Sequence, residues 1–168
     1  MNIIEIIKTK MAGEKTEVMK TLEATPIFSG LTDLELKKIE IITHERVYAR
    51  DEIVFHENEP GAGLYIVCAG EIRLTKMKTG CSDVTITTLK NGEFFGELAL
   101  LDEAPRSANA IAITRTKILG FYRPDFMSLL AREPKLGSKV LLKLAVILAE
   151  RLRTTTTSSI QGASGNAD

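Results

Sequence analysis

The residues best suited to chemistry lie in the segment GEFFGELALLDEAPRSANA, which spans residues 92–110. Glu97 and Arg106 stand nine positions apart in this segment. An ionised glutamate only accepts hydrogen bonds and therefore suits a sugar hydroxyl, whereas arginine offers a planar, permanently charged fork that matches a phosphate. Together the two side chains predict a site for a small sugar phosphate.

Neighbouring residues shape both ends of this predicted site. Gly96 lets the backbone approach a bound group because it has no Cβ. Pro105 fixes its own φ and disfavours helix for the residue before it, so Arg106 leaves a rigid turn. Residues 97–101 are rich in helix formers and predict a short helical turn whose free N–H groups point at the same anion. We therefore expect a carboxylate for the ribose and an arginine for the phosphate.

The segment resembles the phosphate-binding cassette of cyclic nucleotide-binding domains, which reads F-G-E-[LI]-A-L, then four or five residues, then P-R-[ATS]-A. Every place in that pattern is filled, and the resemblance extends over residues 26–156. It implies that Glu97 takes the ribose 2′-hydroxyl and Arg106 the cyclic phosphate, with backbone amides near Gly96, Leu98 and Ser107 helping. The cassette residues expected at the ligand are Gly96, Glu97, Leu98, Ala99, Pro105, Arg106, Ser107 and Ala108.

Residues outside the cassette are expected to contact the base of the ligand. By resemblance to the bacterial catabolite activator family, Leu74 and Ile86 touch the purine, although core packing explains them about equally well. Thr155 and Thr156 fall where that family places hydroxyls on the adenine edge, and solvent-facing helix threonines are the alternative. Ser107 leaves the base open, because serine occurs there in bacterial cAMP binders and threonine there favours guanine. The expected ligand is cAMP rather than cGMP.

Composition limits the other functions that the chain could have. A length of 168 residues and a hydrophobic content of 44% suit one domain with end extensions. Lys plus Arg equals Asp plus Glu at 22 each, which does not support binding to nucleic acid or to an anionic membrane. The sequence has no signal-peptide core and no apolar run of membrane-spanning length, so a cytoplasmic location is the default.

Histidine and cysteine are too sparse to indicate a metal centre. The two histidines are His44 and His56, and the two cysteines, Cys68 and Cys81, stand thirteen residues apart. A barrel oxygenase or hydrolase needs three or four clustered ligands or an activated water. We therefore expect free, reduced thiols, no cofactor besides the ligand, and no enzymatic activity.

Helices are expected ahead of the strands. Apolar residues within positions 1–24 recur mostly every three or four residues, which predicts an amphipathic helix. Thr32 is expected to begin a second helix, with Glu35 as its capping-box partner. That helix is expected to run through Ile42 and to bury Leu34, Ile39 and Ile42.

Short segments rich in Val, Ile, Thr, Tyr and Phe, separated by turn residues, occupy positions 44–123. This pattern predicts a mainly β fold with flanking helices: a double-stranded β-helix, or jelly-roll-like barrel, with N-terminal helices and a C-terminal helical lid. One residue departs from the family, because Asn58 stands where a glycine usually follows the glutamate. Asparagine tolerates positive φ better than other non-glycine residues, so we expect the turn to survive.

The last predicted helix, over residues 133–157, is apolar nearly all round from Val140 to Ala149. Such a helix is buried on more than one side. One side is expected to cover the barrel, and the other to contact the N-terminal helix or the same helix of a second copy, with a homodimer favoured. The expected division is an N-terminal helical extension over 1–25, the cyclic nucleotide-binding domain over 26–157 and a disordered polar tail over 158–168.

The sequence therefore predicts a stand-alone regulatory sensor. It would bind a 3′,5′-cyclic mononucleotide and signal to an unidentified downstream protein by rearranging its helices. No helix-turn-helix is apparent after the last helix. A scaffold that keeps the fold and docks a partner without ligand is the alternative.

Overall fold

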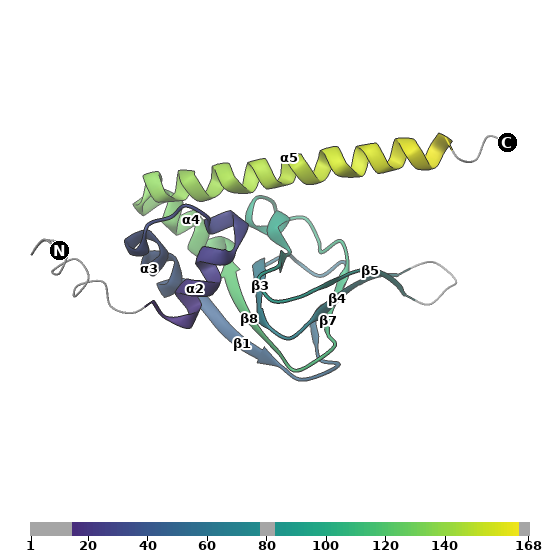
Figure 1. The fold of residues 1–168 in the computed structure, drawn as a ribbon, viewed down its shortest axis with the longest axis horizontal. Coiled ribbons are helices and arrows are strands. Elements are labelled where there is room, and N and C mark those ends of the chain that lie inside the picture. Colours follow the sequence, from purple (N-terminus) through teal and green to yellow (C-terminus); the bar gives the residue numbers. More distant parts are fainter. Residues whose placement is uncertain (1–14, 78–82, 165–168) are drawn as a thin grey trace, which may run out of the picture.

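The structure is a computed structural model that describes residues 15–77 and 83–164, with side chains described as far as residue 155. Within these residues, eight short strands form a roll (Figure 1). The short helices α2, α3 and α4 gather at one end of the roll, beneath the first half of α5 (Figure 1). The second half of α5 extends over the side of the roll that carries β4 and β5 (Figure 1).

Two four-stranded antiparallel sheets make up the roll. The first has the strand order β1-β8-β3-β6, and the second has the order β2-β7-β4-β5. The strands are β1 (Thr43–Tyr48), β2 (Ile53–Phe55), β3 (Gly63–Ala69), β4 (Ile72–Lys76), β5 (Val84–Leu89), β6 (Phe94–Phe95), β7 (Asn109–Ala112) and β8 (Thr116–Tyr122). Strands distant in sequence are neighbours in both sheets, as in a jelly roll. The predicted fold class is confirmed.

Aromatic side chains fill the space between the two sheets. Tyr48, Phe55, Tyr65 and Phe95 are all at least nine-tenths buried there. The rings of Tyr65 and Phe95 stack with their centroids 5.4 Å apart, and Phe55 lies 5.7 Å from Tyr65 and 5.8 Å from Phe95. Rings of this size exclude water from one face of each sheet and hold the sheets at a fixed separation.

A second core joins the helices to the first sheet. Phe121 of β8 contacts Phe28 of η1 (Pro26–Phe28) on one side and Phe126 of α4 (Arg123–Arg132) on the other. Both pairs meet edge to face with centroids 5.7 Å apart, a geometry that aromatic pairs favour. These contacts fix α4 and the N-terminal helices against the same strand.

The N-terminal helices are α2 (Glu17–Ala24) and α3 (Asp33–Ile41). The predicted capping box is confirmed: Glu35 N–H donates to Thr32 Oγ1 at 3.3 Å, and Thr32 N–H donates to Glu35 Oε2 at 2.9 Å. The prediction for Leu34 is wrong, since this side chain is 70% exposed, whereas Leu36 and Ile39 are fully buried. Residues three apart share a helix face, and Leu34, two positions before Leu36, points elsewhere. Residues 1–14 of the expected extension lie outside the described residues.

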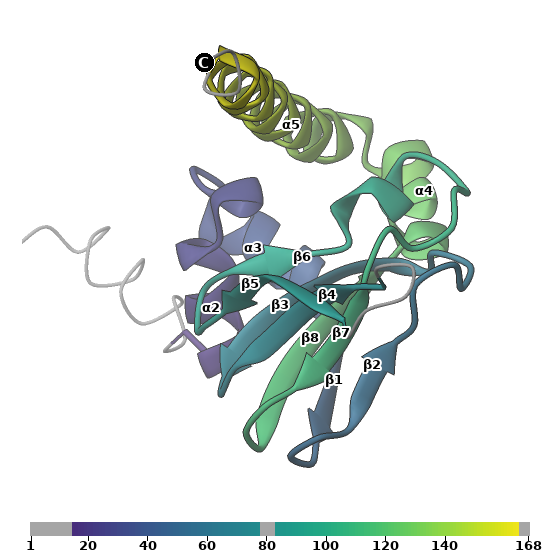
Figure 2. The same cartoon turned by 90° about the vertical axis from the view of Figure 1, so that its right-hand side faces the viewer.

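Helix α5 (Pro134–Ser164) crosses above the roll, with α2 and α3 on one side and α4 on the other (Figure 2). Leu136, Val140 and Leu144 recur every four residues and are buried against the other helices. The opposite side is apolar but exposed, as Leu142 at 67% and Val146 at 47% show. We call Leu141, Leu142, Ala145 and Val146 the outward face of α5.

The helix also continues beyond residue 157, where the polar tail was expected to begin. Its backbone stays helical to Ser164, because no proline interrupts the run and the threonines have only a modest preference against helix. The division at residues 25 and 157 stays a prediction. In the part of the chain that the structure describes, no helix has both the length and the hydropathy needed to cross a bilayer.

Candidate functional site

A cavity of about 320 Å³ opens between the cassette and the β4–β5 hairpin. This volume lies at the lower end of the range of about 300 to 1,000 Å³ that is typical of small-molecule sites. The cavity is lined by Phe55, Leu74, Ile86, Thr87, Leu89, Phe94, Phe95, Gly96, Glu97, Leu98, Ala99, Asp102, Ala104, Pro105, Arg106, Ser107, Ala108 and Arg151. All eight cassette residues that the sequence suggests are therefore brought together, along with Leu74 and Ile86.

The turn before the glutamate is built around Gly96. This residue has φ +73°, in the left-handed region, and it caps the 3₁₀ helix η2 (Glu97–Leu100), so the predicted short helical turn is confirmed. A Cβ at Gly96 would lie 2.5 Å from Nη1 of Arg106 and 3.0 Å from the carbonyl oxygen of Gly63. Glycine is thus required twice, for its φ and for the close approach of the arginine.

Arg106 is a buried cation, only 6% exposed. Its Nη1 donates to the carbonyl oxygens of Gly63 at 3.0 Å and Gly96 at 3.2 Å. The guanidinium carbon lies 4.2 Å from the ring centroid of Phe55 and 5.2 Å from that of Tyr65. These contacts leave the buried Nε without a hydrogen-bond partner. The guanidinium is thus held in place, and its Nε–H remains available to donate to another acceptor.

Burial also affects the protonation equilibrium of Arg106. Desolvation lowers the pKa of Arg106 below its ordinary value, and the neighbouring Tyr65 opposes that shift. A buried charge costs free energy unless it is paired. An anion in the cavity would supply the missing charge and the missing acceptor, which is the chemistry expected of a phosphate site.

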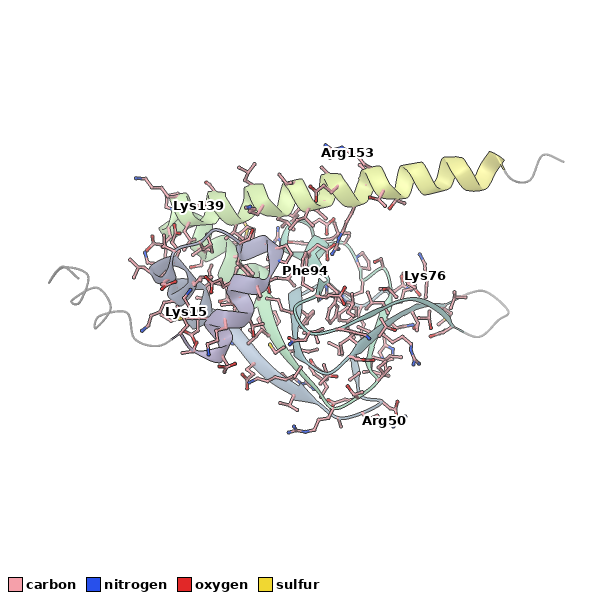
Figure 3. The ribbon with its side chains drawn as sticks, viewed as in Figure 1. Lys15, Arg50, Lys76, Phe94, Lys139 and Arg153 are labelled. Carbon is pink, nitrogen blue, oxygen red and sulfur yellow. The ribbon has the colours of Figure 1, made fainter. Side chains whose placement is uncertain are left out.

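Glu97 is also buried, with 8% of the residue exposed, and its carboxylate forms an ion pair with Arg151 of α5. The guanidinium of Arg151 lies 4.9 Å from the ring centroid of Phe94. Figure 3 labels Phe94 where the roll meets the underside of α5. The residue expected to hold a ribose is therefore linked directly to the long helix.

Arg151 is absent from the residues predicted from the sequence, although the helical period contains a signal for it. Arg151 stands seven positions after Leu144 and eleven after Val140, on the stripe of α5 that faces the roll. The side chain of Arg151 is half exposed at the end of this apolar stripe, and its partner is the buried carboxylate of Glu97. Only the folded structure shows that Arg151 pairs with the carboxylate of Glu97.

Leu74 and Ile86, the residues expected to contact the base, line the cavity from the neighbouring strands β4 and β5. Leu74 also packs against the aromatic cluster between the sheets, so it contributes to the core and to the cavity wall. Ile86 is 55% exposed and lines the cavity without being part of a core cluster. Core packing thus accounts for Leu74 but not for Ile86.

Thr155 does not line this cavity. It lies beside a shallower hollow that also includes Pro26, Phe94 and Arg151, and its hydroxyl donates to the carbonyl oxygen of Arg151 at 2.9 Å. The side chain of Thr156 lies outside the described residues. The role of these threonines at an adenine edge stays a prediction.

A loop between β2 and β3 holds the backbone of Arg106. The N–H of Asn58 donates to the carbonyl oxygen of Arg106 at 2.9 Å, and the N–H of Arg106 donates to that of Glu59 at 2.8 Å. Asn58 has φ +69°, so the turn expected to tolerate asparagine in place of glycine has formed. We call residues 57–59 the clasp loop.

The histidines and the described cysteine lie apart from the cavity. His44 is hydrogen-bonded to Asp125 at 3.2 Å, and His56 is exposed at the start of the loop after β2. Cys68 is a half-buried free thiol whose pKa is raised by burial, whereas Cys81 lies outside the described residues. Within the described ranges no group of three His, Cys, Asp or Glu side chains is placed to hold a metal ion.

Comparison with protein families matches residues 45–133 to the family described as "Cyclic nucleotide-binding domain". The chain is 35% identical over 132 residues to the cyclic AMP receptor protein of Thermus thermophilus, covering 79% of this chain and 59% of the relative. It is 36% identical over 109 residues to the cAMP-dependent protein kinase regulatory subunit of Hypocrea atroviridis, covering 65% of this chain and 22% of the relative. The chain thus spans less than two thirds of the length of each of these relatives.

Solved structures give a similar result. The catabolite activator protein of Thermus thermophilus superposes with a TM-score of 0.75 at 34% identity, covering 83% of this chain and 63% of that structure. A cyclic nucleotide-binding domain from Methylobacillus flagellatus superposes with a TM-score of 0.75 at 27% identity, covering 87% of this chain and 82% of that structure. The similarity therefore includes both the cassette and the roll that positions it.

Proposed function

The chain belongs to the cyclic nucleotide-binding domain family, and we propose that its cavity binds a 3′,5′-cyclic mononucleotide, cAMP in preference to cGMP. The domain is a binding module of regulatory type rather than an enzyme. The preference for cAMP is supported by the names of two relatives, a cyclic AMP receptor protein and a cAMP-dependent kinase regulatory subunit. The exposed hydroxyl of Ser107 favours neither base.

The observation that carries this proposal is the state of Arg106. It is a cation with 6% exposure and an unpartnered buried Nε, on the wall of a cavity that also contains a buried carboxylate. A cyclic phosphate would bind Arg106, and the ribose 2′-hydroxyl would donate to Glu97. The base would then extend toward Leu74 and Ile86, where the wall is apolar.

The ion pair between Glu97 and Arg151 supports a mechanism for the signal. A ribose hydroxyl that donates to Glu97 has to share or displace Arg151, because both approach the same carboxylate. We infer that the hydroxyl displaces Arg151, so that ligand binding favours a different position of α5 from the one that this ion pair stabilises. Rearrangement of α5 and α4 is the output that a downstream protein would detect.

The outward face of α5 supports a homodimer as the regulatory unit. Leu142 and Val146 are apolar and exposed on the helix that also holds Arg151. The same outward face on a second copy is its most direct partner, because a two-fold axis places identical patches in contact. Movement of α5 on ligand binding would then change the contact between the two copies.

Calorimetric titration with cAMP tests the proposed binding site. Replacing Arg106 with alanine leaves a buried phosphate without its charged partner and should cost about 2 to 5 kcal/mol of binding free energy. Arg46 offers a matched control, because its guanidinium also lies over an aromatic ring, 4.4 Å from the centroid of Tyr48. Its side chain is 63% exposed and lies outside the cavity, so Arg46→Ala should bind cAMP as wild type does. Equal cAMP affinity for wild type and Arg106→Ala would overturn the assignment.

The scaffold alternative makes a different prediction for thermal unfolding. A ligand at 100 times its dissociation constant adds about 2.7 kcal/mol to the free energy of unfolding. A panel of cAMP, cGMP and cyclic dinucleotides that leaves the melting temperature unchanged would favour a scaffold that docks partners without ligand. A shift with cAMP alone would support the proposed sensor.

A further inference from the structure

A buried asparagine follows the cassette and takes no part in the roles assigned to its charged residues. Asn109 begins β7 three residues after Arg106 and is 8% exposed. Its Oδ1 accepts from the N–H of Glu57 at 2.8 Å, and its Nδ2 donates to Asp83 Oδ2 at 3.2 Å and Thr75 Oγ1 at 3.4 Å. Thr75 Oγ1 also donates to Asp83 Oδ2 at 3.2 Å. We call Thr75, Asp83 and Asn109 the polar node.

The polar node adjoins an irregularity in the β4–β5 hairpin. The register between these strands shifts between Leu74 and Thr75, so that Ile86 is the extra residue of β5. A β-bulge of this kind redirects side chains and increases the local twist. Ile86 is 55% exposed, so packing against neighbours does not by itself determine where this part of the cavity wall lies. The hydrogen bond from Thr75 of β4 to Asp83, the residue before β5, ties the two sides of the hairpin together beside the bulge.

The same asparagine is connected to the phosphate end of the cavity. Its Oδ1 accepts a hydrogen bond from the N–H of Glu57, the first residue of the clasp loop. The next two residues of that loop, Asn58 and Glu59, exchange backbone hydrogen bonds with Arg106. One side-chain amide therefore joins the bulge that carries Ile86 to the loop that holds the arginine.

We propose that Asn109 is a positioning residue for the base of the ligand. Its two hydrogen-bonding groups set the distance between the β4–β5 bulge and the clasp loop, and hence between the base end and the phosphate end of the cavity. This inference rests on the proposed function, because it concerns how the two ends of one ligand are accommodated together. The guanidinium of Arg106 is held by the carbonyl oxygens of Gly63 and Gly96, and neither hydrogen bond involves Asn109, so the polar node should govern discrimination between bases.

Titrations with cAMP, cGMP and cCMP test this role, because the three nucleotides share ribose and phosphate and differ only in the base. Asp83 is exposed and immediately precedes β5, so Asp83→Ala removes the acceptor of the polar node without opening a cavity in the core. We expect this variant and Asn109→Ala to lose about tenfold in cAMP affinity, as the loss of one or two hydrogen bonds implies. The ratio between the highest and the lowest of the three binding affinities should also move toward one. Asp83→Asn keeps a side-chain oxygen as acceptor and should bind as wild type does.

Glu52→Ala is the matched control, since Glu52, like Asn109, accepts a backbone N–H, that of Ala49 at 2.8 Å, but its partners Ala49 and Arg46 belong neither to the polar node nor to the clasp loop. It should leave all three affinities unchanged. If wild type binds none of the nucleotides, the proposed function fails and this inference fails with it. If wild type binds cAMP but discriminates no base, or if Asp83→Ala and Asn109→Ala keep the wild-type ratio of affinities, the positioning role is overturned while the function stands.

Discussion

Replacement of Gly96 by alanine separates two requirements that the cassette places on one residue. A Cβ at Gly96 would meet Nη1 of Arg106 at 2.5 Å, and the residue has φ +73°. Gly92, four positions earlier, has φ +86° with no atom within 4 Å of the corresponding Cβ. Both glycines thus have a left-handed backbone, but only Gly96 has the arginine beside it. The two alanine variants should differ by the effect of displacing Arg106.

The expected magnitudes follow from these contacts. A left-handed alanine costs roughly 1 to 2 kcal/mol, offset by about 0.4 to 1 kcal/mol because alanine restricts the unfolded chain. Gly92→Ala should therefore lower the free energy of unfolding by about 1 kcal/mol or less. In Gly96→Ala the guanidinium must also move, which weakens its hydrogen bonds to the carbonyl oxygens of Gly63 at 3.0 Å and Gly96 at 3.2 Å. Weakening two hydrogen bonds from a charged donor adds a further loss of about 1 to 3 kcal/mol.

Denaturant unfolding and calorimetric titration with cAMP measure the two effects separately. We expect Gly92→Ala to bind cAMP within about twofold of wild type, as a surface substitution away from the site does. Gly96→Ala should lose about tenfold to a hundredfold in affinity, because its arginine is displaced from the position that the phosphate requires. Equal destabilisation of the two variants, with cAMP affinity intact in both, would refute this account of the arginine.

Three further predictions concern the clasp loop, the α3–α5 contact and the outward face of α5. Asn58→Gly should leave the melting temperature nearly unchanged, whereas Asn58→Val should lower the free energy of unfolding by about 1 to 3 kcal/mol, because a β-branched residue is strained at φ +69°. The hydrogen bond from Lys139 lowers the pKa of Glu35 below its ordinary 4.5, so its contribution to stability is present above that pH and lost as the pH falls through the depressed pKa. Glu35→Gln should therefore flatten the acid side of the stability profile, by under about 1 kcal/mol because the partner Lys139 is half exposed, and an unchanged slope would contradict this contact. Leu142→Glu and Val146→Glu together should shift the protein toward monomer in light scattering without loss of cAMP affinity, and an unchanged molar mass would argue against the dimer.

The charged ends of the candidate site could be predicted because their chemistry is local. Glu97, Arg106 and the glycine and proline beside them lie within one short segment, and the turn that joins them depends on their own φ preferences. The capping box of α3 was predictable for the same reason, since its two partners stand three residues apart. The left-handed turn at Asn58 likewise followed from the residue type.

Features that depend on packing could not be read from the sequence. The burial of Leu34 was predicted wrongly, because the face that a short helix turns inward depends on what it meets. The stripe of α5 indicated that Arg151 faces the roll, but its ion pair with Glu97, 54 residues earlier in the chain, required the helix to be placed over the cassette. The polar node depends on three strands and a loop that meet only in the roll.

The sequence alone determined the family, the fold class and the two groups suited to ribose and phosphate, because each is encoded in residue types at short spacing. The tertiary structure decided that Arg106 is buried with an unpartnered Nε, that Glu97 is bound to α5, and that Asn109 joins the β4–β5 hairpin to the clasp loop. These features arise between segments distant in the chain, where burial and hydrogen-bond partners are determined by how the sheets and helices pack.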